Sequence, residues 1–189
     1  MSNFSDFFSA GGGGLTPKFE EFNSSGTFTP SQALIDAGGY IEVFLVAGGG
    51  RGSSDYYGGS GGETILKEMY LTSTTGCAVT IGAGATSNGG SGGNSTFAGS
   101  SAGGADVTSL GGVGQSGGRQ RDSTMGASWG AQRASYNSTA GSGFLGYGAG
   151  GAADSLYWGG VKSAKANSGQ GSAINNSAGS GYCLIKWYE

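Results

Sequence analysis

The chain has 189 residues, of which 44 are glycine, and it carries 9 basic and 12 acidic residues without a single histidine. Glycine is several times more frequent than its usual share of about 7%, while charged and aromatic residues each make up 11%. Because disordered chains are typically charged and poor in aromatics, and nucleic-acid binding needs clustered Lys and Arg, the composition excludes simple disorder and argues against nucleic-acid binding.

The first 22 residues have a character of their own. Phe4, Phe7 and Phe8 precede four glycines, Gly11 to Gly14, and "LTPKFEEF" leads onward. An aromatic cluster on a flexible tether predicts an attachment segment, residues 1–22, that fills a groove of another protein; the alternative is a terminal segment packed on its own domain. The stretch lacks the basic region and apolar run of a signal peptide, and no apolar run approaches the roughly 20 residues that would cross a bilayer. We therefore expect no membrane insertion.

Residues 23–189 are predicted to form a glycine-rich β domain. "GTFTP" is a short strand stopped by Pro30, and "SQALIDAGG" is either a single helical turn or a turn-rich crossing. "YIEVFLVA", Tyr40 to Ala47, is the strongest strand, and its two mostly apolar faces predict a central position in a sheet. Further strands are expected in "ETILKEMYLT", "GCAVTIGAGA", "NSTFAG", "DVTSLGG" and the C-terminal "GYCLIKWYE". Many short strands with turn signals between them predict an all-β fold, either a β-sandwich or a jelly-roll-like domain.

Residues 111–180 are a low-complexity region rich in glycine, serine and alanine. A structureless loop of this length is unusual inside a compact domain. Glycine-rich backbones can instead run as extended rods of the polyproline or polyglycine II type and pack closely, because no side chain intervenes. The glycine tracts are therefore predicted to be long excursions from a rigid sheet, with backbones packed against one another.

Most routes to enzymatic chemistry are missing from this chain. Without histidine, a Ser-His-Asp or Cys-His arrangement cannot be built. Asp55, Asp106, Asp122 and Asp154 each stand in a different glycine loop, so nothing in the sequence pairs two acids for glycoside hydrolysis. We expect no enzymatic activity, no cofactor and no metal site.

The two cysteines, Cys77 and Cys183, lie in strand-like apolar stretches. We interpret them as buried small hydrophobic residues. A disulfide between neighbouring strands is the alternative.

Isolated aromatic and arginine side chains in the glycine tracts are the candidate recognition residues. Aromatic faces on rigid loops give a large contact area at low entropy cost, and arginine binds anionic groups. The predicted receptor-binding residues are Arg119, Arg121, Trp129, Arg133, Tyr136, Tyr147, Tyr157 and Trp158. The alternative is that these aromatics fill a small core between glycine excursions or a subunit contact.

The order of these motifs resembles a known family. "SGTFTPSQALIDAGGYIEVFLVAGGGRG", "AVTIGAGATSNGGSGGNSTFAG", a glycine-rich region and a terminal "GSGYCLIKWYE" are similar to the glycine-rich domain of tail fibre and tail tip proteins of tailed bacteriophages. The similarity covers most of the chain from Ser25 to Glu189, and "FLVAGGG" and "VTIGAGA" are its most specific parts. "NFSDFFSAGGGG" also resembles the N-terminal attachment segments of such proteins, with Phe4, Phe7 and Phe8 as the virion-attachment residues.

The resemblance implies a virion component, often trimeric, that is assembled in the host bacterial cytoplasm and contacts a surface glycan or outer-membrane protein. A homotrimer would also bury apolar sheet faces that a thin core leaves open. The leading hypothesis is a non-enzymatic adhesin that joins other tail or baseplate proteins through its N-terminus. A structural protein of the tail, baseplate or collar without receptor contact is the alternative, followed by a polysaccharide depolymerase and a glycine-rich wall protein.

Overall fold

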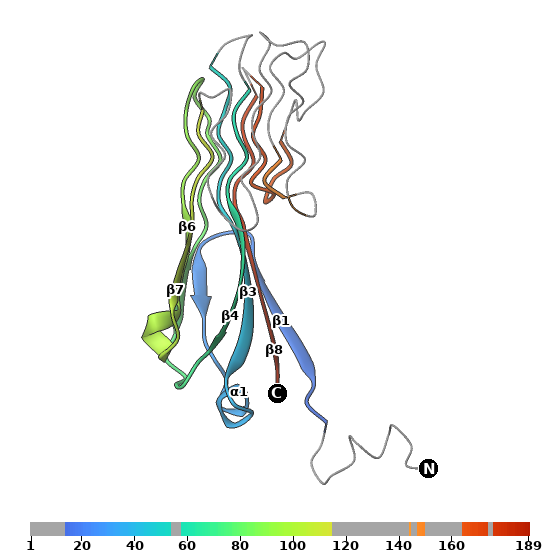
Figure 1. Cartoon of the computed structure of the whole chain (residues 1–189), viewed down its shortest axis with the longest axis vertical. Coiled ribbons are helices and arrows are strands. Elements are labelled where there is room, and N and C mark those ends of the chain that lie inside the picture. Colours follow the sequence, from blue (N-terminus) through green and yellow to red (C-terminus); the bar gives the residue numbers. More distant parts are fainter. Residues whose placement is uncertain (1–13, 54–57, 115–143, 145–146, 150–163, 174–175) are drawn as a thin grey trace, which may run out of the picture.

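A computed structural model describes residues 14–53, 58–114, 144, 147–149, 164–173 and 176–189. It contains two four-stranded antiparallel sheets (Figure 1). Sheet A has the order β1 (Pro17–Phe22), β8 (Tyr182–Tyr188), β3 (Tyr40–Val46) and β4 (Thr64–Tyr70). Sheet B has the order β2 (Gly26–Phe28), β5 (Cys77–Thr80), β6 (Ser95–Ala98) and β7 (Asp106–Ser109).

Helical structure in the described residues is limited to α1 (Gln32–Asp36) and the 3-10 helix η2 (Gly99–Ala102). The hydroxyl of Ser31 caps α1 by accepting a hydrogen bond from the Leu34 amide at 3.0 Å. The helix ends at Asp36 and is followed by Gly38 and Gly39, whose φ angles of 102° and 73° favour glycine. The "SQALIDAGG" stretch is thus one short helix that carries the chain from β2 to β3.

These elements confirm the all-β prediction and most of the expected strands. β3 lies between β8 and β4, which confirms its predicted central position. A β-sandwich suits two sheets that share one core, whereas jelly-roll connectivity and the trimer stay predictions. The stretch 17–22, which the sequence places in the attachment segment, forms β1 and pairs along its whole length with β8.

The core lies between the two sheets because alternate residues of each strand point inward. From β3 these are Ile41, Val43 and Leu45, all fully buried. Phe28 of sheet B contacts Trp187 of sheet A with ring centroids 5.3 Å apart. The remaining core residues include Phe22, Leu34, Met69, Leu71, Val79, Phe97, Val107 and Ile185. Cys77 and Cys183 are buried free thiols, as the first interpretation expected.

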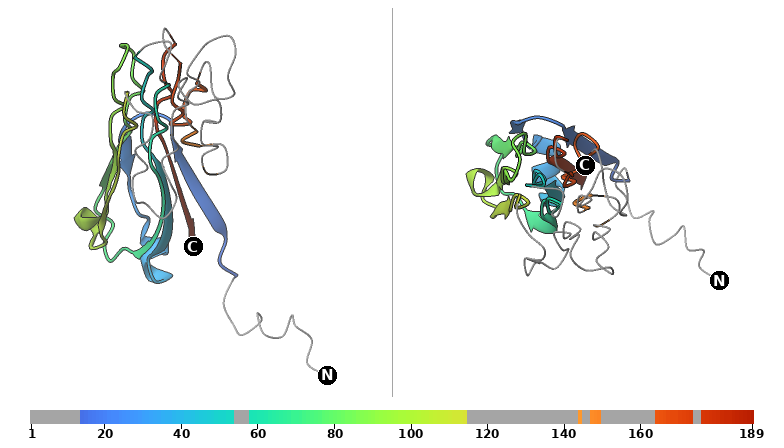
Figure 2. Two further views of the ribbon diagram at one scale, coloured as in Figure 1. Left: turned by 45° about the horizontal axis from the view of Figure 1, so that its top comes forward. Right: turned by 90° about the horizontal axis from the view of Figure 1, so that it is seen from above.

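Beyond the sheets the strands continue as extended glycine-rich segments that run lengthwise beside one another (Figures 1 and 2). We call this part the glycine bundle and define it as residues 47–53, 58–63, 81–85, 90–94, 110–114, 147–149, 168–173 and 176–181. The C-terminus lies at the opposite end of the sheets (Figure 1). The described part of the molecule is therefore elongated, with the sheets at one end and the glycine bundle at the other.

Candidate functional site

Of the predicted receptor-binding residues, only Tyr147 lies in the part of the chain that the structure describes. The others lie outside the described residues, as do the predicted attachment residues: Arg119, Arg121, Trp129, Arg133, Tyr136, Tyr157 and Trp158, and Phe4, Phe7 and Phe8. Two described features bear on function. They are the glycine bundle, which leads to the segments with the predicted recognition residues, and an aromatic hollow that contains Tyr147.

Segment 47–53 lies at the centre of the glycine bundle. Its backbone exchanges hydrogen bonds with segments 58–63, 81–85, 90–94, 110–114, 168–173 and 176–181. Ala47 and Gly50 both donate to segment 58–63, at 3.0 and 2.9 Å, and Gly48 and Arg51 both donate to segment 90–94, each at 3.0 Å. Donors that face one neighbour are thus three residues apart. In a β-strand they would be two apart, because its side-chain and hydrogen-bond directions alternate.

Glycine is required in this arrangement because the segments approach each other too closely for side chains. A Cβ atom added to Gly48 would lie 2.1 Å from the carbonyl oxygen of Ala83, and one added to Gly49 would lie 2.1 Å from that of Gln170. At Gly50 the distance to the carbonyl oxygen of Val113 would be 2.3 Å. The bundle therefore holds together through backbone groups, with few buried side chains of its own.

The loop 86–89 joins two bundle segments and is held by Arg51. The Arg51 guanidinium donates through Nη1 to the carbonyl oxygen of Thr86. The amide of Gly89 donates to the carbonyl oxygen of Gly52 at 3.1 Å. Arg51 therefore stabilises a loop within the protein by hydrogen bonding to its backbone.

Serine and glutamate side chains join the sheets to the bundle. The buried Ser95 hydroxyl donates to the carbonyl oxygen of Val46 at 2.7 Å and accepts from the Gly82 amide at 2.9 Å. The carboxylate of Glu63, which is 6% exposed, accepts from the Leu110 amide at 2.8 Å. These contacts satisfy backbone groups where the strands leave the regular sheet ladder.

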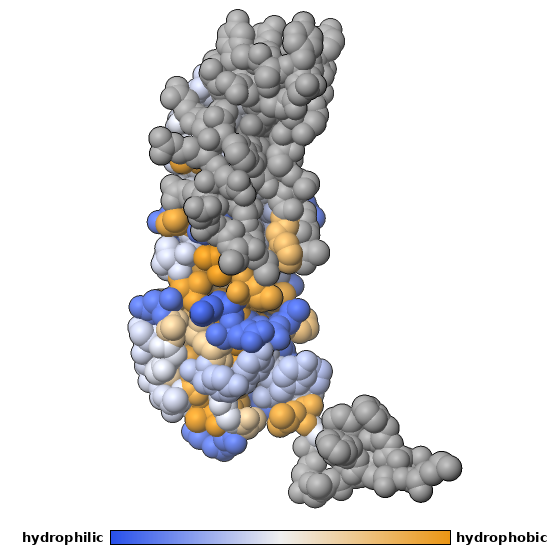
Figure 3. Space-filling model, viewed as in Figure 1, coloured by the Kyte–Doolittle hydropathy of each residue, from blue (hydrophilic) through white to orange (hydrophobic). Residues whose placement is uncertain are grey.

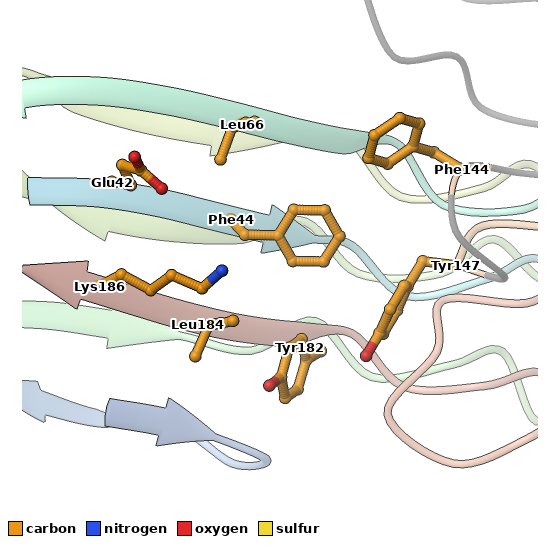
Figure 4. Close-up of a pocket in the computed structure, with 8 residues that line it drawn as sticks. All are labelled: Glu42, Phe44, Leu66, Phe144, Tyr147, Tyr182, Leu184 and Lys186. Carbon is orange, nitrogen blue, oxygen red and sulfur yellow. The ribbon is translucent and has the colours of Figure 1, made fainter. Parts of the chain in front are cut away.

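Tyr147 lies against the outer face of sheet A, in a hollow of about 250 Å³ that we call the upper hollow (Figure 4). Its ring contacts Phe44 edge-on with centroids 5.2 Å apart and stacks on Tyr182 at 5.5 Å. Paired backbone hydrogen bonds of 2.8 and 2.9 Å between Tyr147 and Phe144 place both rings over the sheet. Glu42 and Lys186 line the other side of the hollow (Figure 4). The hollow offers aromatic faces beside one acidic and one basic group.

Burial, together with a hydrogen bond to the carboxylate of Glu21, raises the pKa of Tyr182. Its hydroxyl donates this hydrogen bond and keeps its proton to a more alkaline pH than an ordinary tyrosine does. This position links the aromatic cluster to β1, which carries Glu21.

A second hollow of about 440 Å³, the lower hollow, adjoins the first on the same face. Glu42, Leu184 and Lys186 line both hollows, and Pro17, Phe19 and Tyr188 lie at the far side of the lower one. Phe19 is 68% exposed and Tyr188 is 50% exposed. In the view that Figure 3 shows, apolar and charged residues lie close together on the surface of the sheet end. The outer face of sheet A is therefore a partly apolar surface, which is unusual for a sheet face in water.

The sequence singles out Tyr147 as a candidate recognition residue, a role that stays a prediction, and it does not single out the residues around it. The alternation of Tyr40, Glu42, Phe44 and Val46 already placed Phe44 and Glu42 on one face of a strand. The pairing of Phe44 with Leu184, and of Glu42 with Lys186, depends on the β3–β8 register. That register could not be read from strand patterns far apart in the chain.

The described residues contain neither a candidate membrane-spanning helix nor a candidate metal-binding cluster. No described helix is long and apolar enough to cross a membrane. Within the same residues, no group of three or more His, Cys, Asp or Glu side chains is placed to hold a metal ion.

Comparison with known proteins does not assign the chain to a family. No protein-family model matches the chain, and no curated protein matches it.

Proposed function

We propose that this protein is a non-enzymatic adhesin of a bacteriophage tail, either a tail fibre or a tail tip protein. In this proposal the segments that connect the glycine bundle present aromatic and arginine side chains to a bacterial surface glycan or outer-membrane protein. The virion tail is its location, after assembly in the host cytoplasm. The sheet end of the molecule joins it to other tail or baseplate proteins, and the working unit is a homotrimer.

The glycine bundle is the observation that carries the proposal. Donors three residues apart that face one neighbour fit a helix of three residues per turn, so we assign the bundle to the polyglycine II type. Packing through backbone groups is independent of the residues in the connecting segments. Those segments can therefore vary in sequence while the scaffold that holds them stays the same, as receptor recognition requires.

A structural role in the tail, baseplate or collar is the second candidate. The apolar outer face of sheet A favours it, because exposed aromatic surface is typical of protein contacts. The two candidates differ in whether the end of the bundle touches a receptor.

Adsorption competition tests the proposal. Purified protein is added to host cells together with the phage that carries it, and free phage are counted. An adhesin blocks adsorption, and Trp158→Ala or Tyr136→Ala weakens the block at least about tenfold, since an aromatic recognition residue contributes of the order of 2 kcal/mol. Tyr70→Ala is the matched control, because Tyr70 is 64% exposed but lies in β4 of sheet A. If saturating folded protein leaves adsorption unchanged, the adhesin proposal fails and the structural role takes its place.

A further inference from the structure

The outer face of sheet A carries two adjoining hollows, the upper and the lower, which share Glu42, Leu184 and Lys186 as lining residues and which no described residue fills. The pairing of Pro17 with Tyr188 and of Phe22 with Cys183 gives the direction of their floor. The lower hollow lies near Tyr188, and the upper one near Tyr182 at the start of the glycine bundle. We call the whole feature the sheet groove.

We propose that the aromatic N-terminal segment, residues 1–13 of the same chain, docks in the sheet groove. The segment lies outside the described residues, and the proposal rests on where it joins the sheet, on its length and on its sequence. It does not rest on the proposed function. It chooses between the two interpretations of the aromatic segment that its sequence left open.

The chain enters sheet A beside the lower hollow. Thr16 and Glu189 exchange backbone hydrogen bonds of 2.7 and 3.1 Å, so the chain is fixed from residue 16 onward. Pro17 and Lys18, the next two residues, line the lower hollow. Leu15, which precedes them, is 58% exposed. The segment therefore begins at the edge of the groove.

The segment is long enough to follow the groove. From Tyr188 to Tyr182 the strand β8 covers roughly 20 Å, at about 3.3 Å per residue. From Gly11 back to Phe4 the chain can span up to about 23 Å when extended. Gly11 to Gly14 provide a stretch in which the chain can reverse direction without side-chain clashes. Phe4 can thus reach the upper hollow.

The order of side chains in the segment matches the order of sites in the groove. From the tether outward the sequence gives Phe8, then Asp6, then Phe4, three alternate residues that point to one side of an extended chain. From the tether outward the groove offers the lower hollow, then Lys186, which lines both hollows, then the upper hollow. Aromatic rings fit the aromatic and leucine walls of each hollow, and an aspartate fits a lysine between them.

Lys186 is available for such a contact. Among the described residues the one ion pair joins Lys18 to Glu189, at 3.8 Å. The Lys186 ammonium is exposed and takes no part in it, and Glu42, which lies opposite Lys186 in the β3–β8 register, lines both hollows with it. Asp6 is the single acidic residue of the first 13.

Docking within one chain is favoured over docking on a second copy. A short flexible tether gives an effective concentration in the millimolar range. A separate copy at about micromolar concentration would compete at a roughly thousandfold disadvantage, whereas a neighbour within a trimer would not, so the cross-linking below distinguishes the two. The segment of the same chain is therefore the occupant.

Cysteine cross-linking in the full chain tests the proposal. Phe8→Cys is combined with Tyr188→Cys in the lower hollow, and disulfide formation in oxidised glutathione is followed by gel mobility and free-thiol counting. The control combines Phe8→Cys with Thr80→Cys, an exposed position of β5 in sheet B. Burial raises the pKa of Cys183 to about 12 and also raises that of Cys77, so the native thiols react slowly.

We expect an intramolecular disulfide that forms at least about tenfold faster with Tyr188→Cys than with Thr80→Cys, because of the high effective concentration. Equal rates in both pairs would overturn the proposal. Disulfide-linked dimers, whether or not their rate rises with protein concentration, would also overturn it and would assign the groove to the segment of a second copy.

Dye binding gives an independent readout that needs no cysteine. The variant with Phe4, Phe7 and Phe8 all changed to serine should bind an apolar fluorescent dye severalfold more strongly than the parent, because the sheet groove is open. Adding Leu184→Glu to that variant should abolish the gain, since Leu184 lines both hollows. Unchanged dye binding in the triple-serine variant contradicts the proposal. Neither readout depends on adsorption, so failure here is distinguishable from failure of the adhesin proposal.

Discussion

At the scale of single residues, this protein uses glycine as a packing residue. Gly50 donates to the carbonyl oxygen of Ser60 at 2.9 Å and accepts from the Ser172 amide at 3.1 Å. Its Cα also faces the carbonyl oxygen of Val113, where a methyl group would lie at 2.3 Å. One glycine therefore contacts three neighbouring segments through its backbone alone. The energetic consequence is that the cost of ordering glycine is offset by hydrogen bonds rather than by buried side chains.

Gly50→Ala should lower the free energy of unfolding by about 1–3 kcal/mol, the usual cost of overpacking. The added methyl group would have to move backbone, since the nearest atoms are a carbonyl group. Urea unfolding of the two proteins measures the difference. Gly14→Ala is the matched control, because a Cβ at Gly14 has no atom within 4 Å. If the two variants are equally stable, the prediction that close packing around Gly50 excludes a side chain is wrong.

At the scale of elements, the strands β3 to β8 each pass directly into a glycine segment at the same end of the sheets. β3 continues into segment 47–53, and segment 176–181 continues into β8. Ser95 and Glu63 satisfy backbone groups at this junction. The sheets can therefore align the bundle, since strands fixed by one register enter it side by side.

The C-terminal residue joins three elements at the opposite end of sheet A. The Glu189 carboxylate accepts hydrogen bonds from the hydroxyl of Ser31 at the start of α1 and from the Trp187 indole, at 3.1 Å for the latter. Those two bonds, and to a lesser degree Lys18 of β1, hold the pKa of Glu189 below its ordinary value of 4.5.

A folded-state pKa below the unfolded value means that the contribution of Glu189 is present above pH 4.5 and is lost as the pH falls through the folded pKa. Glu189→Gln should therefore be less stable than the parent near neutral pH, with the difference shrinking as the solution is acidified. Thermal unfolding over a pH series measures it. Glu68→Gln, an exposed glutamate of β4, is the control. A constant difference between parent and Glu189→Gln at all pH values would contradict the assignment.

At the scale of the whole molecule, the two ends differ in what they can bind. The sheet end carries exposed Leu15, Phe19, Tyr70 and Tyr188. The bundle end leads into the segments that hold the predicted recognition residues. This polarity suits a protein that attaches at one end and recognises a receptor at the other.

We expect a homotrimer, because a thin core leaves apolar surface that association can bury. Light scattering coupled to gel filtration should give three times the chain mass of 18.5 kDa. A dilution series separates a stable trimer from weak association. A mass of one chain at all concentrations would exclude the trimer and leave the intramolecular docking of residues 1–13 unaffected.

The sequence by itself determined the strands, since alternation in Tyr40–Val46 and in the C-terminal stretch is a local property of the chain. It also indicated that glycine tracts would pack as backbone rods. Only the tertiary structure decided which segments surround 47–53, because glycine has no side chain that could encode a partner. The same holds for the aromatic hollow. Phe44, Tyr147 and Tyr182 are far apart in sequence, and only the register of β3 with β8 and the backbone pairing of Phe144 with Tyr147 bring their rings together.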